Sequence, residues 1–308
     1  MLHTDVPAND GEEAERIPRQ KGSTVTDTMD ANAVLKQKHR AMWALGNYPE
    51  LATDIIADLG PRLVAAANVK SGDRVLDVAA GAGNAAIPAA MRGADVIASD
   101  LTPELLEVGK REAQMHGVTL DWQTADAEAL PFDTASFDVT MSCVGVMFAP
   151  HHQATADELL RVTRPGGTIA VLNWTPQGFV GQMFATMKPY AAPPAPGAQP
   201  PPLWGDEAHV RELFGDAVRD VTARLDTVRI SHFGSPEEFR DYFKSHYGPT
   251  IACYRNIGDD PERVAALDAE LVALGERFAA ASTDSGDAGS GTGFEMGWEY
   301  LLVTATRA

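Results

Sequence analysis

The stretch RVLDVAAGAGNAAIPAA, from Arg74 to Ala90, is typical of a strand, a tight turn and a helix in succession. Its first residues form a short apolar run, which Gly81 and Gly83 interrupt, and the small residues that follow predict the helix. Such a loop brings backbone N–H groups and a helix N-terminus close to a ligand, because glycine carries no side chain. As G-x-G-x-x-A it also fits the relaxed dinucleotide fingerprint, so by itself it does not distinguish NAD from other adenosine-containing cofactors.

Strands and helices alternate after this loop. The segments ADVIASD, TLDWQTA, FDVTMSC and TIAVLNW predict strands, and TPELLEVGKREAQMHG and QATADELLRVTR predict helices between them. This alternation predicts an α/β fold with a Rossmann-like parallel sheet and helices on both faces. We expect a disordered tail at 1–28 and one domain at 29–308. Within it we expect N-terminal helices at 29–70, the cofactor-binding core at 71–175, a helical and Pro-rich lid with the remaining core elements at 176–297, and a final strand at 298–308.

Composition excludes several classes of function. The chain has 308 residues, 44% of them hydrophobic, and a formal net charge of −18. Without a basic run it offers no surface that would follow nucleic-acid phosphates. No stretch approaches the roughly 20 apolar residues of a membrane span, and the first residues lack the apolar segment of a secretory signal. The two cysteines have no metal-ligand spacing, so we expect a cytoplasmic protein without membrane insertion.

Three carboxylates favour one cofactor over the other. Asp77 lies inside the apolar strand, where an ionised group needs a cation or a donor, such as the ammonium of an amino-acid moiety. Asp100 follows Gly81 by 19 residues, at the end of the next strand, where a carboxylate can accept both ribose hydroxyls. Asp126 ends the third strand, near where an adenine edge would lie. Each could instead be a structural acid or a cap.

Taken together, these motifs resemble the class I S-adenosylmethionine-dependent methyltransferases, in particular the small-molecule group that includes the ubiquinone and menaquinone biosynthesis enzymes. The resemblance spans residues 33–175 and rests on VLDVAAGAGN, SDLTPELL, ADAEALPF and LLRVTRPGGTIAVLNW. A common form of the first motif has glycine where this chain has Ala79. The resemblance implies a seven-stranded sheet whose last strand is antiparallel and pairs with the segment VTARLDTVRISHF.

The resemblance also implies roles for individual residues. It places the first-motif residues at the methionine end of the cofactor, Asp100 at the ribose and Asp126 at the adenine, and N-terminal aromatic residues over the cofactor. The full set of expected cofactor-binding residues is Asp77, Ala79, Gly81, Gly83, Asp100, Leu101, Asp126, Ala127, Trp43 and Tyr48. Aromatic faces suit a sulfonium cation, although Trp43 and Tyr48 could equally belong to the core.

Histidines near the predicted open edge of the sheet are candidates for a general base. They are His151, His152 and His246, each of which could also be a solvated side chain. Residues expected in a substrate pocket are Phe148, Asn173, Trp174, Tyr242 and Tyr247, with core packing as the alternative. Phe239, in the same helical segment, is expected in the core. The carboxylate cluster of the metal-dependent methyltransferases is missing, so we expect no metal.

The sequence therefore predicts methyl transfer from S-adenosylmethionine to a small, hydrophobic acceptor such as a phenol, an enol or quinol, or an amine. Two other functions stay open at this point. One is an NAD(P)-binding oxidoreductase, and the other is a protein that holds the cofactor without transferring its methyl group. The identity of the acceptor, the use of a base, and whether the chain forms a homodimer are not determined by these patterns.

Overall fold

The computed structural model describes residues 1–2, 25–284 and 294–308. Seven strands form one sheet in the order β3-β2-β1-β4-β5-β7-β6. The first five strands are parallel, and β7 runs antiparallel between β5 and β6, which confirms the expected topology and the expected pairing of the last strand. Their bounds are β1 Arg74–Val78, β2 Asp95–Asp100, β3 Asp121–Thr124, β4 Phe137–Cys143, β5 Thr163–Trp174, β6 Val218–Ile230 and β7 Met296–Arg307.

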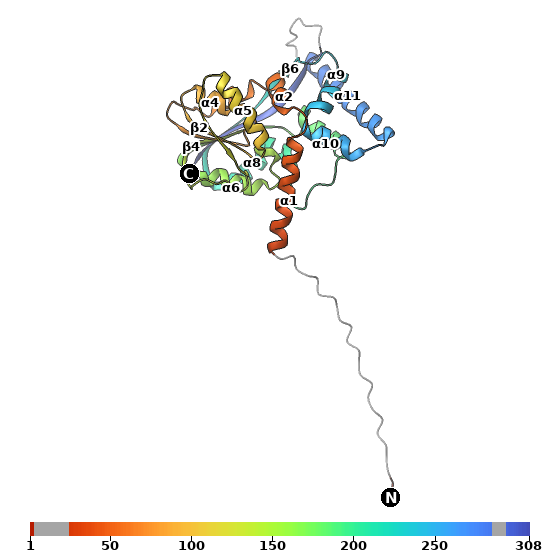
Figure 1. Ribbon diagram of the computed structural model, residues 1–308, viewed down its shortest axis with the longest axis horizontal. Helices are drawn as coiled ribbons and strands as arrows, with labels where there is room; N and C mark the ends of the chain where they lie inside the picture. Colours follow the sequence, from red (N-terminus) through yellow and green to blue (C-terminus); the bar gives the residue numbers. More distant parts are fainter. Residues whose placement is uncertain (3–24, 285–293) are drawn as a thin grey trace.

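Helices cover both faces of the sheet. Figure 1 shows α4 (Ala86–Met91) and α5 (Pro103–Met115) on one side, and α6 (His152–Val162) and α8 (Glu207–Phe214) on the other. Helix α3 (Leu59–Ala66) packs against α4. The central strands β1 and β4 lie between two helical layers and are largely buried, which explains why they contain short continuous apolar runs, whereas β3 and β6 are mostly exposed.

The second half of the chain adds a helical unit that packs against β7. It consists of α7 (Phe179–Met187), α9 (Pro236–His246), α10 (Gly248–Ile257) and α11 (Pro261–Asp284). Phe239 and Phe243, one turn apart on α9, are both buried, as expected for Phe239. Phe179 stacks on Trp298 with 4.8 Å between ring centroids. This part of the predicted lid is therefore packed as core.

The Pro-rich segment is largely exposed over residues 191–200 and packs inward only at its end. It ends in a short 3-10 helix, η2 (Pro201–Gly205), in which Trp204 is fully buried. A Cβ on Gly205 would lie 2.0 Å from the carbonyl oxygen of Trp174, so only glycine permits this close approach to the end of β5. Two further 3-10 turns are η1 (Val146–Phe148) after β4 and η3 (Gly215–Ala217) before β6.

Three helices precede the first strand, and the first of them begins before the N-terminal helices expected at 29–70. Helix α1 (Val25–Trp43) begins inside the tail expected at 1–28, whose residues 3–24 lie outside the described part of the chain. After α1, Gly46 adopts a left-handed φ of +69°, and α2 (Tyr48–Ile55) starts beyond it. Asn47 caps α2 by accepting from the Glu50 amide.

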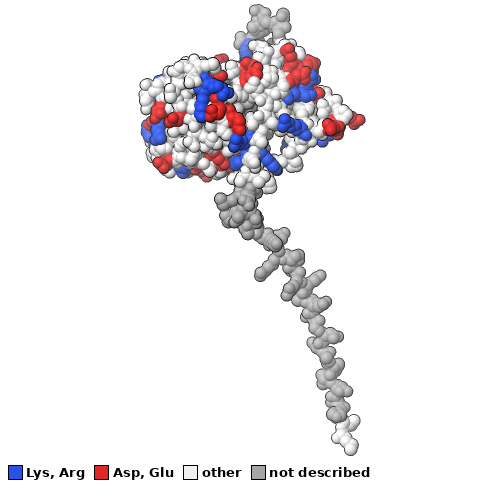
Figure 2. Space-filling model, viewed as in Figure 1, with Lys and Arg blue, Asp and Glu red and all other residues white. Residues whose placement is uncertain are grey.

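The surface carries both signs of charge. On the face shown in Figure 2, basic side chains lie among acidic ones rather than in a continuous basic stripe. Within the described residues, no helix is both long and apolar enough to cross a bilayer.

Candidate functional site

The glycine loop after β1 is built from left-handed backbone. Ala79, Gly81 and Gly83 have φ values of +54°, +56° and +88°. For glycine this conformation costs little, whereas for Ala79 it costs about 1 kcal/mol. A Cβ on Gly83 would lie 2.8 Å from the ring of Trp122, while one on Gly81 would meet only Tyr48, at 3.6 Å. Trp122 therefore packs closely against the loop at Gly83, whereas Gly81 faces Tyr48.

Asp100, at the end of β2, holds this loop in place. One carboxylate oxygen accepts from the Gly81 amide at 2.9 Å, and the other accepts from the Thr102 amide at 2.8 Å. Burial raises the pKa of Asp100, although these amide hydrogen bonds oppose the shift. Each oxygen has two lone pairs, so the carboxylate can still accept from a ligand hydroxyl.

Asp77 lies under the loop, within β1. It is 1% exposed, and neither carboxylate oxygen has a hydrogen-bond partner among the described residues. Burial raises its pKa to about 8; the nearby Ala86 amide lowers it in part, and the charge of Asp100 raises it further. A buried acid without a partner is costly, so this position favours a ligand that brings a positive charge or a donor.

Asp126, after β3, belongs to an ionic network that reaches α1. Lys36 Nζ lies 2.8 Å from Asp126 Oδ1 and 2.7 Å from Glu128 Oε2, and the Lys36 side chain is only 11% exposed. Glu128 also accepts from the backbone N–H of His151 and lies 2.9 Å from its Nδ1. Burial raises the pKa of Glu128, but its hydrogen bonds with Lys36 and His151 outweigh this effect and hold it below the usual value.

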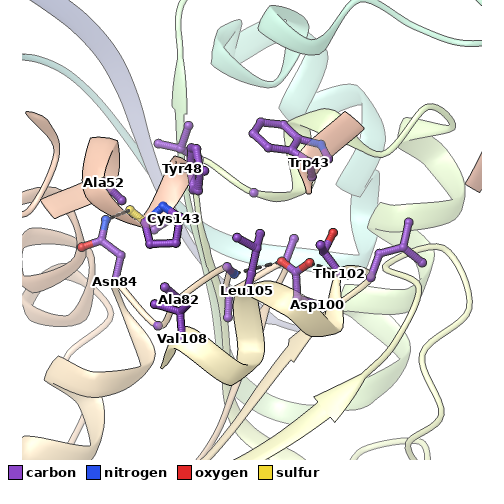
Figure 3. Close-up of a pocket in the computed structure, with 18 of the residues that line it drawn as sticks. Trp43, Tyr48, Ala52, Ala82, Asn84, Asp100, Thr102, Leu105, Val108 and Cys143 are labelled. Atoms are coloured by element: carbon purple, nitrogen blue, oxygen red, sulfur yellow. Dashed lines mark hydrogen bonds between the residues drawn. The ribbon is translucent and has the colours of Figure 1, made fainter. Parts of the chain in front are cut away.

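These groups surround a cavity of about 710 Å³, which is within the usual range for small-molecule sites. Figure 3 shows Asp100, Thr102 and Ala82 on one side of it and Trp43 and Tyr48 facing them from the other. Trp43 packs edge-on against Tyr48, at 5.2 Å between ring centroids, and against Phe148, at 4.6 Å. An aromatic wall therefore faces the glycine loop across the cavity.

Most of the expected cofactor residues line this cavity. They are Ala79, Gly81, Gly83, Asp100, Leu101, Asp126, Ala127, Trp43 and Tyr48, together with Phe148 from the expected substrate pocket. Asp77 lies below the cavity rather than in its wall.

None of the three expected catalytic histidines lines the cavity. His151 pairs with Glu128. His152 is fully buried with its Nδ1 2.9 Å from His209 Nε2, and burial lowers its pKa to about 4. His246 stacks on Tyr242, at 4.0 Å between ring centroids, and its Nε2 lies 3.6 Å from Glu50.

The other expected substrate residues also lie outside the large cavity. Asn173 is fully buried, and its side-chain amide has no partner among the described residues. The hydroxyl of Tyr242 donates to Asp54 at 2.9 Å. Trp174 and Tyr247 line a separate inner cavity of about 20 Å³.

Sequence reasoning missed several residues of the large cavity. Lys36 and His39 line it from α1, and Asn84 and Cys143 line it near β4. Burial and the charge of Lys36 lower the pKa of His39, so its imidazole is neutral at pH 7. The available signal was the spacing of Lys36, His39 and Trp43, which places all three on one helical face.

Comparison with known proteins agrees with this geometry. Residues 75–167, which include the glycine loop and the carboxylates of Asp77, Asp100 and Asp126, match a family described as "Methyltransferase domain". The chain belongs to the class I S-adenosylmethionine-dependent methyltransferases. This methyltransferase is 37% identical over 113 residues to a demethylmenaquinone methyltransferase of Paenarthrobacter aurescens, which covers 37% of this chain and 43% of that one.

A longer match is with uncharacterized protein Rv1403c of Mycobacterium tuberculosis. It is 49% identical over 269 residues, which covers 87% of this methyltransferase and 94% of the relative. Among solved structures, the YcgJ protein of Bacillus subtilis has a TM-score of 0.53 at 18% identity, covering 81% of this chain and 98% of that one. At that identity the likeness supports the fold alone.

The site fits S-adenosylmethionine, the cofactor of this family. Asp77 supplies the unpartnered carboxylate that an ammonium would satisfy, and Gly81 and Gly83 of the left-handed loop line the cavity. Asp100 and Asp126 would hold the ribose and the adenine, and Trp43 and Tyr48 would cover the cofactor. Among the residues that the structure describes, no group of three or more histidine, cysteine or acidic side chains is placed to hold a metal ion.

Proposed function

We propose that this methyltransferase acts on a small, uncharged and largely apolar acceptor. The observation that carries the proposal is the charge of the cavity wall. Lys36 is the only lysine or arginine among the described lining residues, and Asp126 and Glu128 already neutralise it. Five carboxylates line the same cavity, at Glu50, Asp54, Asp100, Glu112 and Asp126. A phosphate or carboxylate on the acceptor would meet repulsion without a free cation to offset it.

The chemistry suits such a wall. Bound S-adenosylmethionine supplies an electrophilic methyl group on a sulfonium. The carbon–sulfur bond breaks as the new bond to the acceptor forms, so the protein contributes mainly by holding the two reactants in line. When the nucleophile is anionic, charge is neutralised in the reaction, and apolar surroundings such as Trp43, Tyr48 and Phe148 then favour it.

A neutral hydroxyl or amine acceptor must also lose a proton when it is methylated. Among the groups lining the cavity that can take it are His39, Glu50 and Asp54. His39 is neutral at pH 7, and the two carboxylates sit one turn apart on α2. These residues therefore replace the histidines chosen from the sequence as our candidates for a base.

We further propose that the enzyme works in the cytoplasm and engages a small molecule rather than nucleic acid. Both cysteines are free thiols, which suits a reducing compartment. A homodimer remains a proposal drawn from the sequence.

The test is a turnover assay that measures release of S-adenosylhomocysteine with three matched series of aromatic acceptors. The series carry a neutral hydroxyl or amine, the same ring with a carboxylate, and the same ring with a phosphate. We expect turnover to be confined to the neutral series. A preference for the carboxylate or phosphate series would overturn the proposal.

A further inference from the structure

A second, smaller cavity lies behind the aromatic wall. It has a volume of about 20 Å³ and shares Tyr48, Val144 and Phe148 with the large cavity. Its other described lining residues are Leu51, Ile56, Trp174, Val180, Met183, Phe243, Tyr247 and Trp298, and none of them is charged. At this size the cavity holds about one water molecule.

The inner cavity lies at the edge of the sheet where ligands bind. Val144 directly follows β4, and Trp174 is the last residue of β5. In open α/β sheets the carboxyl ends of the parallel strands form the ligand crevice. Tyr48 faces the glycine loop in the large cavity and also lines the inner one, so this side chain, together with Val144 and Phe148, lies between the two cavities.

One lining residue has an unsatisfied hydrogen-bond donor. Trp298 is 2% exposed, and its indole N–H has no acceptor among the described residues. Phe179 covers one face of the indole by stacking, and Trp174 packs edge-on at 5.7 Å between ring centroids. A buried tryptophan N–H normally finds an acceptor. Trp204 has an unpaired N–H too, but of the two only Trp298 lines the inner cavity, so its donor is the one available to an oxygen that enters there.

We propose, on the basis of the function proposed above, that the inner cavity is the acceptor site in a collapsed form, and that it takes a neutral aromatic ring carrying an oxygen that accepts from Trp298. The ring enters by displacing Phe148 and Met183. Phe148 lies on the short η1 turn and is partly exposed, and methionine adapts easily because it is unbranched. A pocket of this kind is a minor conformation that its ligand makes dominant.

The large cavity also offers a competing location. It continues between α2 and α4, where Ala57 and the 60% exposed Met91 line it. This outer groove could hold an apolar ring as well, but it offers no unsatisfied buried donor among the described residues. The two locations can be distinguished by substituting a larger side chain in one of them and not in the other.

The experiment uses the full chain saturated with S-adenosylhomocysteine. Binding of 4-ethylphenol, ethylbenzene and 4-ethylbenzoate is measured by calorimetry in the wild type and in Trp298→Phe, Met183→Phe and Ala57→Phe. Trp298→Phe removes the N–H and keeps an aromatic ring, Met183→Phe fills the inner cavity, and Ala57→Phe fills the outer groove. Affinity for S-adenosylhomocysteine and the melting temperature show whether each variant is folded.

We expect 4-ethylphenol to bind at least fivefold more tightly than ethylbenzene, and 4-ethylbenzoate not to bind. Trp298→Phe should remove the preference for the phenol, Met183→Phe should weaken both neutral ligands at least tenfold, and Ala57→Phe should leave both unchanged. The inference is overturned if Ala57→Phe alone blocks binding, or if the phenol preference survives Trp298→Phe. It also fails if neutral phenols are methylated but none of the three rings binds, whereas absence of any turnover with neutral acceptors contradicts the proposed function itself.

Discussion

Replacing Lys36 by methionine should release α1 from the cofactor site. Methionine keeps much of the apolar stem but removes the ammonium, which lies 2.8 Å from Asp126 and 2.7 Å from Glu128. Removing one partner of a buried ion pair typically costs about 3–5 kcal/mol, because the other charge stays buried. Glu128 keeps its contacts to His151, and Asp126 is 24% exposed, so we expect about 2 kcal/mol here.

The loss of stability should be confined to α1 and should not extend to the whole fold. Hydrogen exchange of α1 should become roughly 30-fold faster, as expected for 2 kcal/mol, while exchange in β1 and β4 stays unchanged. Affinity for S-adenosylhomocysteine should fall with it, because Asp126 loses the group that holds its carboxylate in place. Lys36→Arg keeps a positive charge, so it should retain most of the wild-type protection of α1 and most of the wild-type affinity for S-adenosylhomocysteine.

Arg40→Met is the matched control. Arg40 lies four residues further along α1 and contacts Glu104 at the same distance of 2.8 Å, but both side chains are about half exposed. Exposed ion pairs contribute little, so this variant should resemble the wild type. If Lys36→Met and Arg40→Met change exchange and affinity equally, the reasoning about burial is wrong.

Three other predictions, which use four substitutions, test the remaining parts of the site. Asp100→Ala should weaken binding of S-adenosylhomocysteine at least tenfold, or about 1.4 kcal/mol, in a calorimetric titration; unchanged affinity in a folded variant would contradict the assignment. Asp77, with a pKa of about 8, is mostly protonated at pH 7 and makes the free protein less stable as the pH rises from about 4 to 8. Binding of an ammonium should ionise it, so calorimetry in buffers of different ionisation enthalpy should show proton release that Asp77→Asn abolishes. Gly145→Ala should abolish binding of S-adenosylhomocysteine, because the new Cβ would lie 2.3 Å from the Ala79 carbonyl oxygen. Ala79→Gly, by contrast, should change this affinity by no more than about twofold. Equal effects of the two substitutions would show that the loop is not packed as described.

The sequence was sufficient for the sheet and for the strand-end carboxylates because both depend on local patterns. Gly81, Asp100 and Asp126 each follow a predicted strand, and parallel strands bring their carboxyl ends to one edge. Their convergence on one cavity thus needed no knowledge of distant contacts.

The expected base and substrate residues depended on contacts that the local pattern does not contain. His152 is buried because His209, 57 residues later, meets its ring. Asn173 and Trp174 were predicted together, yet neighbouring residues of a strand point to opposite faces, so only Trp174 lines the inner cavity. Lys36 was overlooked because its partners come from another part of the chain, where Glu128 and Asp126 follow β3.

Helix α1 connects the two ends of the site, so we expect it to couple binding of the cofactor to binding of the acceptor. Lys36 and Trp43 are seven residues apart on one face, about 10 Å along the axis. Lys36 holds the expected adenine carboxylate, while Trp43 packs on Tyr48 and Phe148, which separate the two cavities. Since a helix moves as a unit, a cofactor that favours the docked α1 also fixes the wall through which the acceptor must pass. Such coupling is reciprocal. S-adenosylhomocysteine should therefore change the affinity for 4-ethylphenol by a certain factor, and 4-ethylphenol should change the affinity for S-adenosylhomocysteine by the same factor. Calorimetry in both orders measures this factor, and a value of one in the wild type would show that α1 does not link the two sites.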